Sequence, residues 1–329
     1  MRTKILIIFY IIITIIFVNI RQINAERKIL NKPEYKIKFS ERAKKINKAE
    51  VYKLQDGGHK IVWVQEGKKY EQIEYPTTLL DVIVECSVKE ASNENEFQFL
   101  YTVHNSKKSK QSFTYLGIEY INEVFNQNIP VKSDWWIGKR NHCLKENRSK
   151  TVIGTVYDNR KWLIWGARRS AIIISGTSKG FFSFESNGLP GIVYCIGNGG
   201  QDGPKWPVEP DEEIAKARPR SGKDILYGKT VGAVEWFKTA EEGLKRLEDY
   251  AEESFVQGWI ETEVEKNRIL KEIGELKKIV LSNRTLEIKK QSIENFMKNI
   301  QKYYDEKQIL SETFALIYYN SRALIKILK

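Results

Sequence analysis

The chain has 329 residues, of which 41% are hydrophobic and 29% are charged, as is ordinary for a globular protein. Its formal net charge of +12 would fit a nucleic-acid-binding protein if that charge lay on the folded part. The segment 26–70, however, holds thirteen basic residues against six acidic ones, so much of the surplus lies in an N-terminal arm. The charge distribution therefore argues against a nucleic-acid partner.

Residues 1–25 have the pattern of a secretory signal peptide. Arg2 and Lys4 supply a positive start, residues 5–18 supply an apolar run, and Ala25 is a small residue before a cleavage point. The apolar run of about fourteen residues is shorter than the roughly twenty that a spanning helix needs. We expect a secreted or periplasmic protein that contacts a membrane only if this segment stays uncleaved as an anchor.

The segment 26–48 is charged and predicts a flexible lead-in. From residue 49 to residue 236, short apolar runs alternate with turn residues and contain no helical period. This pattern predicts an antiparallel β-sandwich of the immunoglobulin-like class. Asp56-Gly57-Gly58 is expected to turn the first hairpin, and Gly188-Leu189-Pro190-Gly191 to form a later turn. The Gly- and Pro-rich segment 197–223 is expected to be a loop insertion.

Cysteine and histidine usage bears on redox state and on metals. The three cysteines and three histidines have no metal-ligand spacing, so we expect neither a zinc site nor a cofactor. Cys86 and Cys195 each occupy the inward face of a predicted strand. In an oxidising compartment they could form a disulfide, and two separate buried thiols are an equally good interpretation.

The hydrophobic period changes near residue 238. Thr239 and Glu242 fit a capping box, in which the threonine begins a helix and the glutamate lies at its third position. Four amphipathic segments follow, and Ser311 is expected to cap the last of them. Each segment has one apolar stripe, and these stripes are buried most simply against one another. Residues 239–329 are therefore predicted to form a four-helix bundle domain.

Two sets of residues carry resemblances to known families. The helical set consists of a turn and of spaced packing positions: Phe255-Val256-Gln257-Gly258-Trp259-Ile260, Leu270, Ile273, Leu276, Ile293, Phe296, Met297, Ile300, Leu310, Ser311 and Ala315. On these residues, segment 244–328 resembles the FIMAH-type helical domain of secreted bacterial proteins, which implies an accessory role in binding or assembly. The runs Tyr101-Thr102-Val103-His104-Asn105-Ser106 and Gly188-Leu189-Pro190-Gly191-Ile192-Val193 resemble an uncharacterised class of secreted bacterial β-sandwiches, and this likeness implies no activity.

One motif has the form of a catalytic site. Gly176-Thr177-Ser178-Lys179-Gly180 fits the G-x-S-x-G nucleophile elbow, which needs a strand before the serine, a helix after it and a histidine further along. Here the residues that follow predict a strand, and all three histidines precede Ser178. We therefore interpret the motif as a polar hairpin turn and identify no catalytic residue.

The remaining candidates are aromatic and acidic side chains. Trp135, Trp136 and Trp206 could form a platform for sugar rings, although the aromatics of a sandwich more often belong to its core. The sequence thus predicts a secreted, non-catalytic binding or structural module for an envelope polysaccharide or a protein partner. The alternative is an extracellular hydrolase with a carboxylate pair, which leaves no sequence signature. Its first candidates are Glu185 and Asp202.

Overall fold

The structure is a computed structural model that describes the residues 30–31, 45–46, 49–54, 57–65, 67–74, 79–93, 95–128, 135–141, 160–167, 172–200 and 226–328. The predicted signal peptide and the insertion beyond residue 200, including Asp202 and Trp206, lie outside these residues. Of the predicted flexible lead-in 26–48, the structure describes Leu30–Asn31 and Lys45–Ile46, and both are paired β-strands instead. Within the described part, no helix has the length and apolar character needed to cross a membrane. Antiparallel strands come first and helices follow residue 239, as the sequence predicts.

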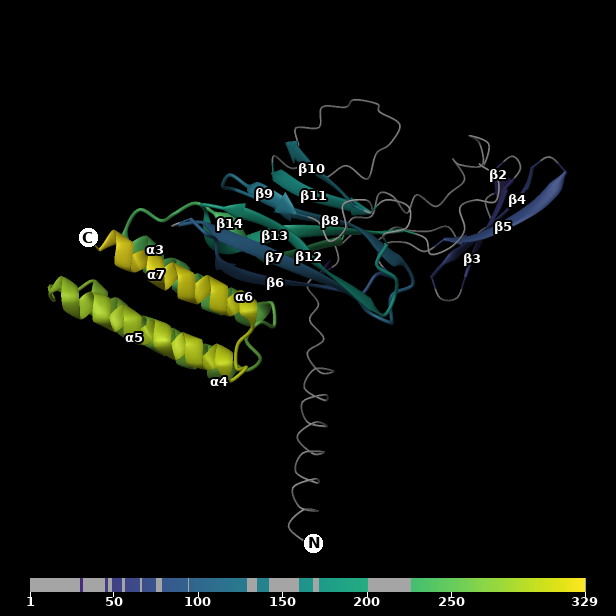
Figure 1. Cartoon of the computed structure of the whole chain (residues 1–329). Coiled ribbons are helices and arrows are strands. Elements are labelled where there is room, and N and C mark those ends of the chain that lie inside the picture. The colour runs from purple at the N-terminus through teal and green to yellow at the C-terminus, as the bar shows by residue number, and fades with distance from the viewer. Residues whose placement is uncertain are drawn as a thin grey trace, which may run out of the picture.

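The largest sheet has six strands in the order β1-β14-β13-β8-β11-β10, and every neighbouring pair is antiparallel (Figure 1). Its strands have the following bounds: β1 Leu30–Asn31, β8 Ser112–Glu119, β10 Trp135–Asn141, β11 Lys161–Ala167, β13 Leu189–Gly200 and β14 Leu226–Val234. β11, a predicted strand of the densest apolar stretch, lies between β8 and β10. Residues 197–200 were predicted to begin the loop insertion, but they belong to β13 and pair there with β8 and β14. The pairing of β13 with β14 joins segments on either side of the insertion.

A second, four-stranded sheet has the order β6-β7-β12-β9. Its strands are β6 Val82–Glu90, β7 Phe97–Asn105, β9 Phe125–Asn128 and β12 Thr177–Ser186. Every second residue of β7 is buried, which is the pattern of a strand with one face on the core and one face toward solvent. The hydroxyl of Tyr101 donates to the carbonyl of Val231 at 2.8 Å and so links this sheet to the larger one.

A third, smaller sheet contains β2 Lys45–Ile46, β3 Ala49–Lys53, β4 His59–Gln65 and β5 Lys68–Glu74, in that order. Gly57 lies between β3 and β4 with φ of +85°, a backbone conformation that favours glycine. The predicted first hairpin is therefore present. Trp63 of β4 stacks on Tyr70 of β5 with ring centroids 5.4 Å apart.

Helices follow the sheets: α3 Ala240–Val256, α4 Glu263–Val280, α5 Leu286–Asp305, and a last helix composed of α6 Ser311–Phe314, the π-helical η3 Ala315–Tyr319 and α7 Asn320–Ile327. Thr239, Thr262 and Thr285 each accept the amide of the third helical residue, which satisfies one open donor per helix. The predicted cap at Ser311 is wrong. Leu310 holds the capping position and makes no side-chain cap, while the Ser311 hydroxyl donates to Glu312 instead.

The helices pack directly on the β structure. Figure 1 shows α3 and the last helix next to the sheets, with α4 and α5 on their far side. Buried side chains of both regions form one continuous core, in which Val84 of β6 and Phe99 of β7 belong to the same cluster as Leu244, Ile317 and Leu324 of the helices. The apolar stripes of the helices are therefore buried against a sheet as well as against one another.

The last helix covers the outer edge of β6, which is an edge strand of its sheet. Glu312 accepts the backbone amide of Cys86 at 3.0 Å, and the Tyr319 hydroxyl donates to the carbonyl of Val88 at 3.2 Å. Arg322 forms an ion pair with Glu90 farther along the strand. An edge strand presents unpaired backbone groups that invite association with other chains, so these contacts protect the sheet.

Two predictions involve residues that lie in strands of the largest sheet, and the second of them needs correction. Trp135, a residue of the predicted aromatic platform, begins the edge strand β10 beside β11. Of the turn expected at Gly188-Leu189-Pro190-Gly191, only Gly188 lies outside β13, and the other three residues pair with β14. Pro190 is tolerated within this strand, where its carbonyl accepts the side-chain amide of Asn320 at 2.8 Å.

Candidate functional site

A polar cluster lies on the outer face of the β6-β7-β12 sheet. Alternation along β7 buries Tyr101 and Val103 in the core and places Thr102 and His104 on the opposite face. The register of β7 with β12 sets Ser178 directly across from His104. Three adjacent strands thus bring together side chains that lie far apart in the sequence.

We call Glu85 of β6, His104 of β7 and Ser178 of β12 the Ser178 cluster. Nδ1 of His104 lies 2.7 Å from Oγ of Ser178, which is hydrogen-bond distance. Nε2 of the same ring lies 3.0 Å from Oε2 of Glu85, an ion-pair distance when the imidazole is protonated. The side chains of His104 and Glu85 are 36% and 46% exposed, so solvent and large molecules can reach them.

The expectation that Ser178 has no histidine partner is therefore wrong. It rested on chain order, because all three histidines precede the serine. Order in the sequence does not decide the matter, since unrelated proteins assemble the same three side chains in different chain orders. The nucleophile-elbow motif also needs a helix after the serine. The structure has a strand there, as the sequence predicts, because β12 continues through Ser178 to Ser186. His104 and Glu85 carried no sequence signal beyond their positions on the outward side of alternating strands.

A β-bulge lies next to the cluster. The register of β12 on β7 shifts between Lys179 and Phe182, so Gly180 and Phe181 both lie opposite Thr102. A Cβ atom at Gly180 would lie only 3.0 Å from Oγ1 of Thr102, which favours glycine at this close approach. Phe181 has φ of +71°, a conformation that bulky side chains rarely adopt, and its side chain is 73% exposed. The bulge therefore holds an aromatic ring in solvent at a cost in backbone strain.

Replacing Phe181 with glycine should raise the free energy of unfolding by up to about 1 kcal/mol, because glycine adopts positive φ without steric penalty. Chemical denaturation of both proteins would measure the difference. Tyr194 is a suitable control, since it is an exposed strand aromatic without positive φ. Its replacement by glycine should lower stability by about 0.5–1 kcal/mol. Equal losses in the two variants would contradict the strain at Phe181.

The predicted aromatic platform is not assembled from the described residues. Trp135 is only 1% exposed, and its ring packs edge-on against Phe182 with centroids 4.8 Å apart. It is therefore a core residue and has no ring face to offer a ligand. The Trp136 side chain and all of Trp206 lie outside what the structure describes.

The two cysteines predicted to face inward are buried, and both are free thiols in the structure. Burial raises the pKa of Cys195 to about 12. Burial and the neighbouring charge of Glu312 raise the pKa of Cys86 well above its ordinary value. Because the thiolate is the reactive form, neither sulfur is suited to nucleophilic chemistry at neutral pH.

Of the candidate carboxylate pair, Glu185 and Asp202, the structure describes only Glu185. Glu185 of β12 accepts the side-chain amide of Asn126 at 2.5 Å and that of Gln98 at 3.5 Å. Its suggested partner, Asp202, lies outside the described residues, so the pairing stays a prediction. Among the residues described, His, Cys, Asp and Glu side chains form no group of three that could hold a metal ion.

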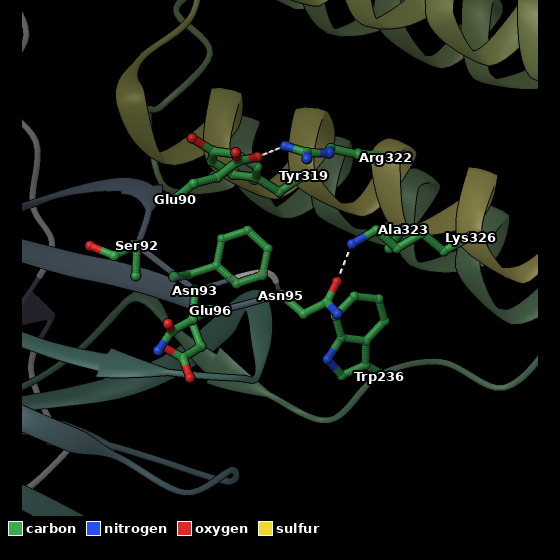
Figure 2. Close-up of a pocket in the computed structure, with 12 residues that line it drawn as sticks. Glu90, Ser92, Asn93, Asn95, Glu96, Trp236, Tyr319, Arg322, Ala323 and Lys326 are labelled. Atoms are coloured by element: carbon green, nitrogen blue, oxygen red, sulfur yellow. Dashed lines mark hydrogen bonds and ion pairs between the residues drawn. The ribbon is translucent and has the colours of Figure 1, made fainter.

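Two pockets lie away from the Ser178 cluster. The first, of about 290 Å³, opens between the β6-β7 turn and α7 (Figure 2). In it Arg322 pairs with Glu90, and Lys326 donates to Asn95, so its charged groups are largely engaged with the chain itself. The second, of about 650 Å³, lies on the outer side of α5 and α7.

Comparison with known proteins does not assign this chain to a family. No family model matches it, and a search of curated proteins finds no significant match.

Proposed function

We propose that this protein is an exported binding module, which recognises an envelope polysaccharide through the outer face of the β6-β7-β12 sheet. In this proposal the two larger sheets form an immunoglobulin-like β-sandwich, and segment 239–329 is a FIMAH-like four-helix accessory domain. Export to the cell exterior or the periplasm is supported by the pattern of residues 1–25. The observation that carries the proposal is the exposed ring of Phe181, held outward by a strained bulge.

Strained backbone conformations persist only where the surrounding structure maintains them, and they concentrate at functional sites. The Phe181 ring has polar neighbours in the same sheet, namely Ser178 and, on β7, Thr102 and His104. Sugars offer apolar ring faces and hydroxyl groups, so they suit an aromatic side chain that is flanked by hydrogen-bonding groups. An open face also suits a long polymer better than a small, enclosed ligand.

A glycan and peptidoglycan array probed with the full chain and with Phe181→Gly tests this proposal. We expect the wild-type protein to retain at least one polysaccharide, and we expect Phe181→Gly to lose at least about tenfold in affinity, or about 1.4 kcal/mol. Tyr194→Gly is the matched control and should bind as the wild type does. Equal binding by Phe181→Gly would exclude the bulge face as the recognition surface. If the array captured no glycan and the chain bound a protein partner instead, the ligand class would be a protein and not a polysaccharide.

A further inference from the structure

We propose that the binding face is also catalytic: Ser178 acts as a nucleophile toward carboxylic esters, His104 is its general base, and Glu85 is the positioning residue for the imidazole. This activity does not depend on the identity of the polymer that the face binds. It rests on the geometry of three side chains and on the irregular backbone beside them.

The distances between Ser178, His104 and Glu85 support a nucleophilic serine. A serine becomes nucleophilic when a base lies within hydrogen-bond reach and a third group orients that base. Here the serine-to-imidazole distance is 2.7 Å and the imidazole-to-carboxylate distance is 3.0 Å. All three side chains project from paired strands, whose register fixes their spacing better than a loop could.

The neighbours of the His104 ring favour one of its two neutral tautomers. A neutral histidine ring has one N–H donor and one bare nitrogen that accepts. With the hydrogen on Nε2, that N–H lies 3.0 Å from the Glu85 carboxylate, at ion-pair distance but outside hydrogen-bond geometry, and Nδ1 is left to accept the proton of Ser178. A carboxylate at Nε2 favours this tautomer and also stabilises the imidazolium that forms after the proton moves. The two contacts thus support one direction of proton transfer.

The backbone around Ser178 is irregular. β9 pairs with β12 only at Ser183 and Glu185, so no described strand covers the other side of β12 near Ser178. The bulge interrupts the β7 ladder at Gly180 and Phe181, immediately beyond the serine. Backbone amides that point to the place where negative charge develops stabilise an oxyanion in acyl transfer. We assign that role to the amides of the bulge.

The chemical step is an ordinary acyl transfer. Oγ of Ser178 forms a bond to the carbonyl carbon of the ester while its proton passes to His104. The bond between that carbon and the alcohol oxygen then breaks, and His104 returns the proton to the departing alcohol. Water, deprotonated by the same imidazole, attacks the acyl carbon, the bond between that carbon and Oγ of Ser178 breaks, and His104 returns the proton to Oγ as the carboxylic acid leaves. His104 and Glu85 are accessible on the outer face of the sheet, so the ester is one displayed on an accessible polymer, such as an acylated glycan.

A fluorophosphonate probe tests the nucleophile on the full chain. Attack by Oγ on phosphorus expels fluoride, and the labelled residue is located by peptide mass spectrometry. We expect the label on Ser178, its disappearance in Ser178→Ala, and a decrease in labelling rate of at least ~100-fold in His104→Ala. Added imidazole should restore part of the rate in His104→Ala. Glu85→Gln should label slowly, and Glu85→Asp should recover part of the loss.

Ser87 provides the matched control. It is an exposed serine on the outer side of β6, and its cross-strand partner is Leu100 instead of a histidine. Ser87→Ala should leave the labelling unchanged. If Ser178 is labelled no faster than Ser87, or equally fast in folded His104→Ala, the proposal is overturned. Glycan binding by Ser178→Ala is measured separately and should fall far less than the labelling, which disappears, so that a failure of catalysis is distinguished from a failure of recognition.

Discussion

Replacing Trp135 with alanine is expected to lower the free energy of unfolding by about 3–5 kcal/mol, as is usual when a large aromatic is removed from a core. The ring is 1% exposed and packs against Phe182, within the cluster of side chains that joins the two larger sheets. Its loss would leave a cavity that the surrounding core side chains close only in part. Urea denaturation, followed by circular dichroism, measures the change.

Trp236 serves as the control for this prediction. It is only partly buried, and its indole nitrogen donates to the carbonyl of Asn187 at 2.7 Å. Trp236→Ala should therefore cost about 1–2 kcal/mol, less than the loss at Trp135. If Trp135→Ala retained full stability but lost polysaccharide binding, the ring would belong to a ligand platform, as the sequence alone allows, and its burial in the core would be wrong.

Elements with local signals could be predicted from the sequence. Thr239 predicted the start of α3 correctly, because a side-chain cap depends only on residues three positions apart. The full capping box is not formed, since the Glu242 carboxylate accepts the amide of Lys238 instead of that of Thr239. The alternation of β6 and β7 was equally visible, since burial of one face repeats every second residue. These signals suffice to predict antiparallel strands followed by helices along the chain, which the structure confirms.

The Ser178 cluster depends on information that is not local. His104 and Ser178 are 74 residues apart, and they meet only because β12 pairs with β7 in one particular register. A shift of that register by one residue would turn Ser178 to the other face of the sheet. The glycines around the serine indicated a turn, yet the strand passes through them with a bulge. Sequence patterns identify the faces of strands, but they do not identify which faces become neighbours.

Glu312 illustrates the same limit in the helical region. An acidic residue in the first turn of a helix is usually explained by the helix dipole and is expected at the surface. Here Glu312 is fully buried, because its helix lies against the edge of β6. No property of the helix itself reveals that a strand 226 residues earlier supplies the partner amide.

Replacing Glu312 with alanine should lower the free energy of unfolding by about 3 kcal/mol. Two losses add: the buried amide of Cys86 is left without its acceptor, at about 1–3 kcal/mol, and the removed side chain leaves a small cavity. Glu312→Gln is the matched variant, because it retains an oxygen that can accept the amide, and it should cost about 1 kcal/mol or less. Equal losses in the two variants would contradict the hydrogen bond as the source of stability.

Native-state hydrogen exchange gives the sharper measurement. In Glu312→Ala the Cys86 amide should exchange faster than amides in the middle of β7, because β6 is the edge strand and its open side would lose its acceptor. The Tyr319 contact with Val88 lies two residues farther along the same edge, so loosening should spread along β6. An uncovered edge pairs readily with other chains, and self-association should therefore rise in the alanine variant and stay low in the glutamine variant. The helices would then act as the cover that keeps the sheet, and with it the Ser178 face, in a single folded unit.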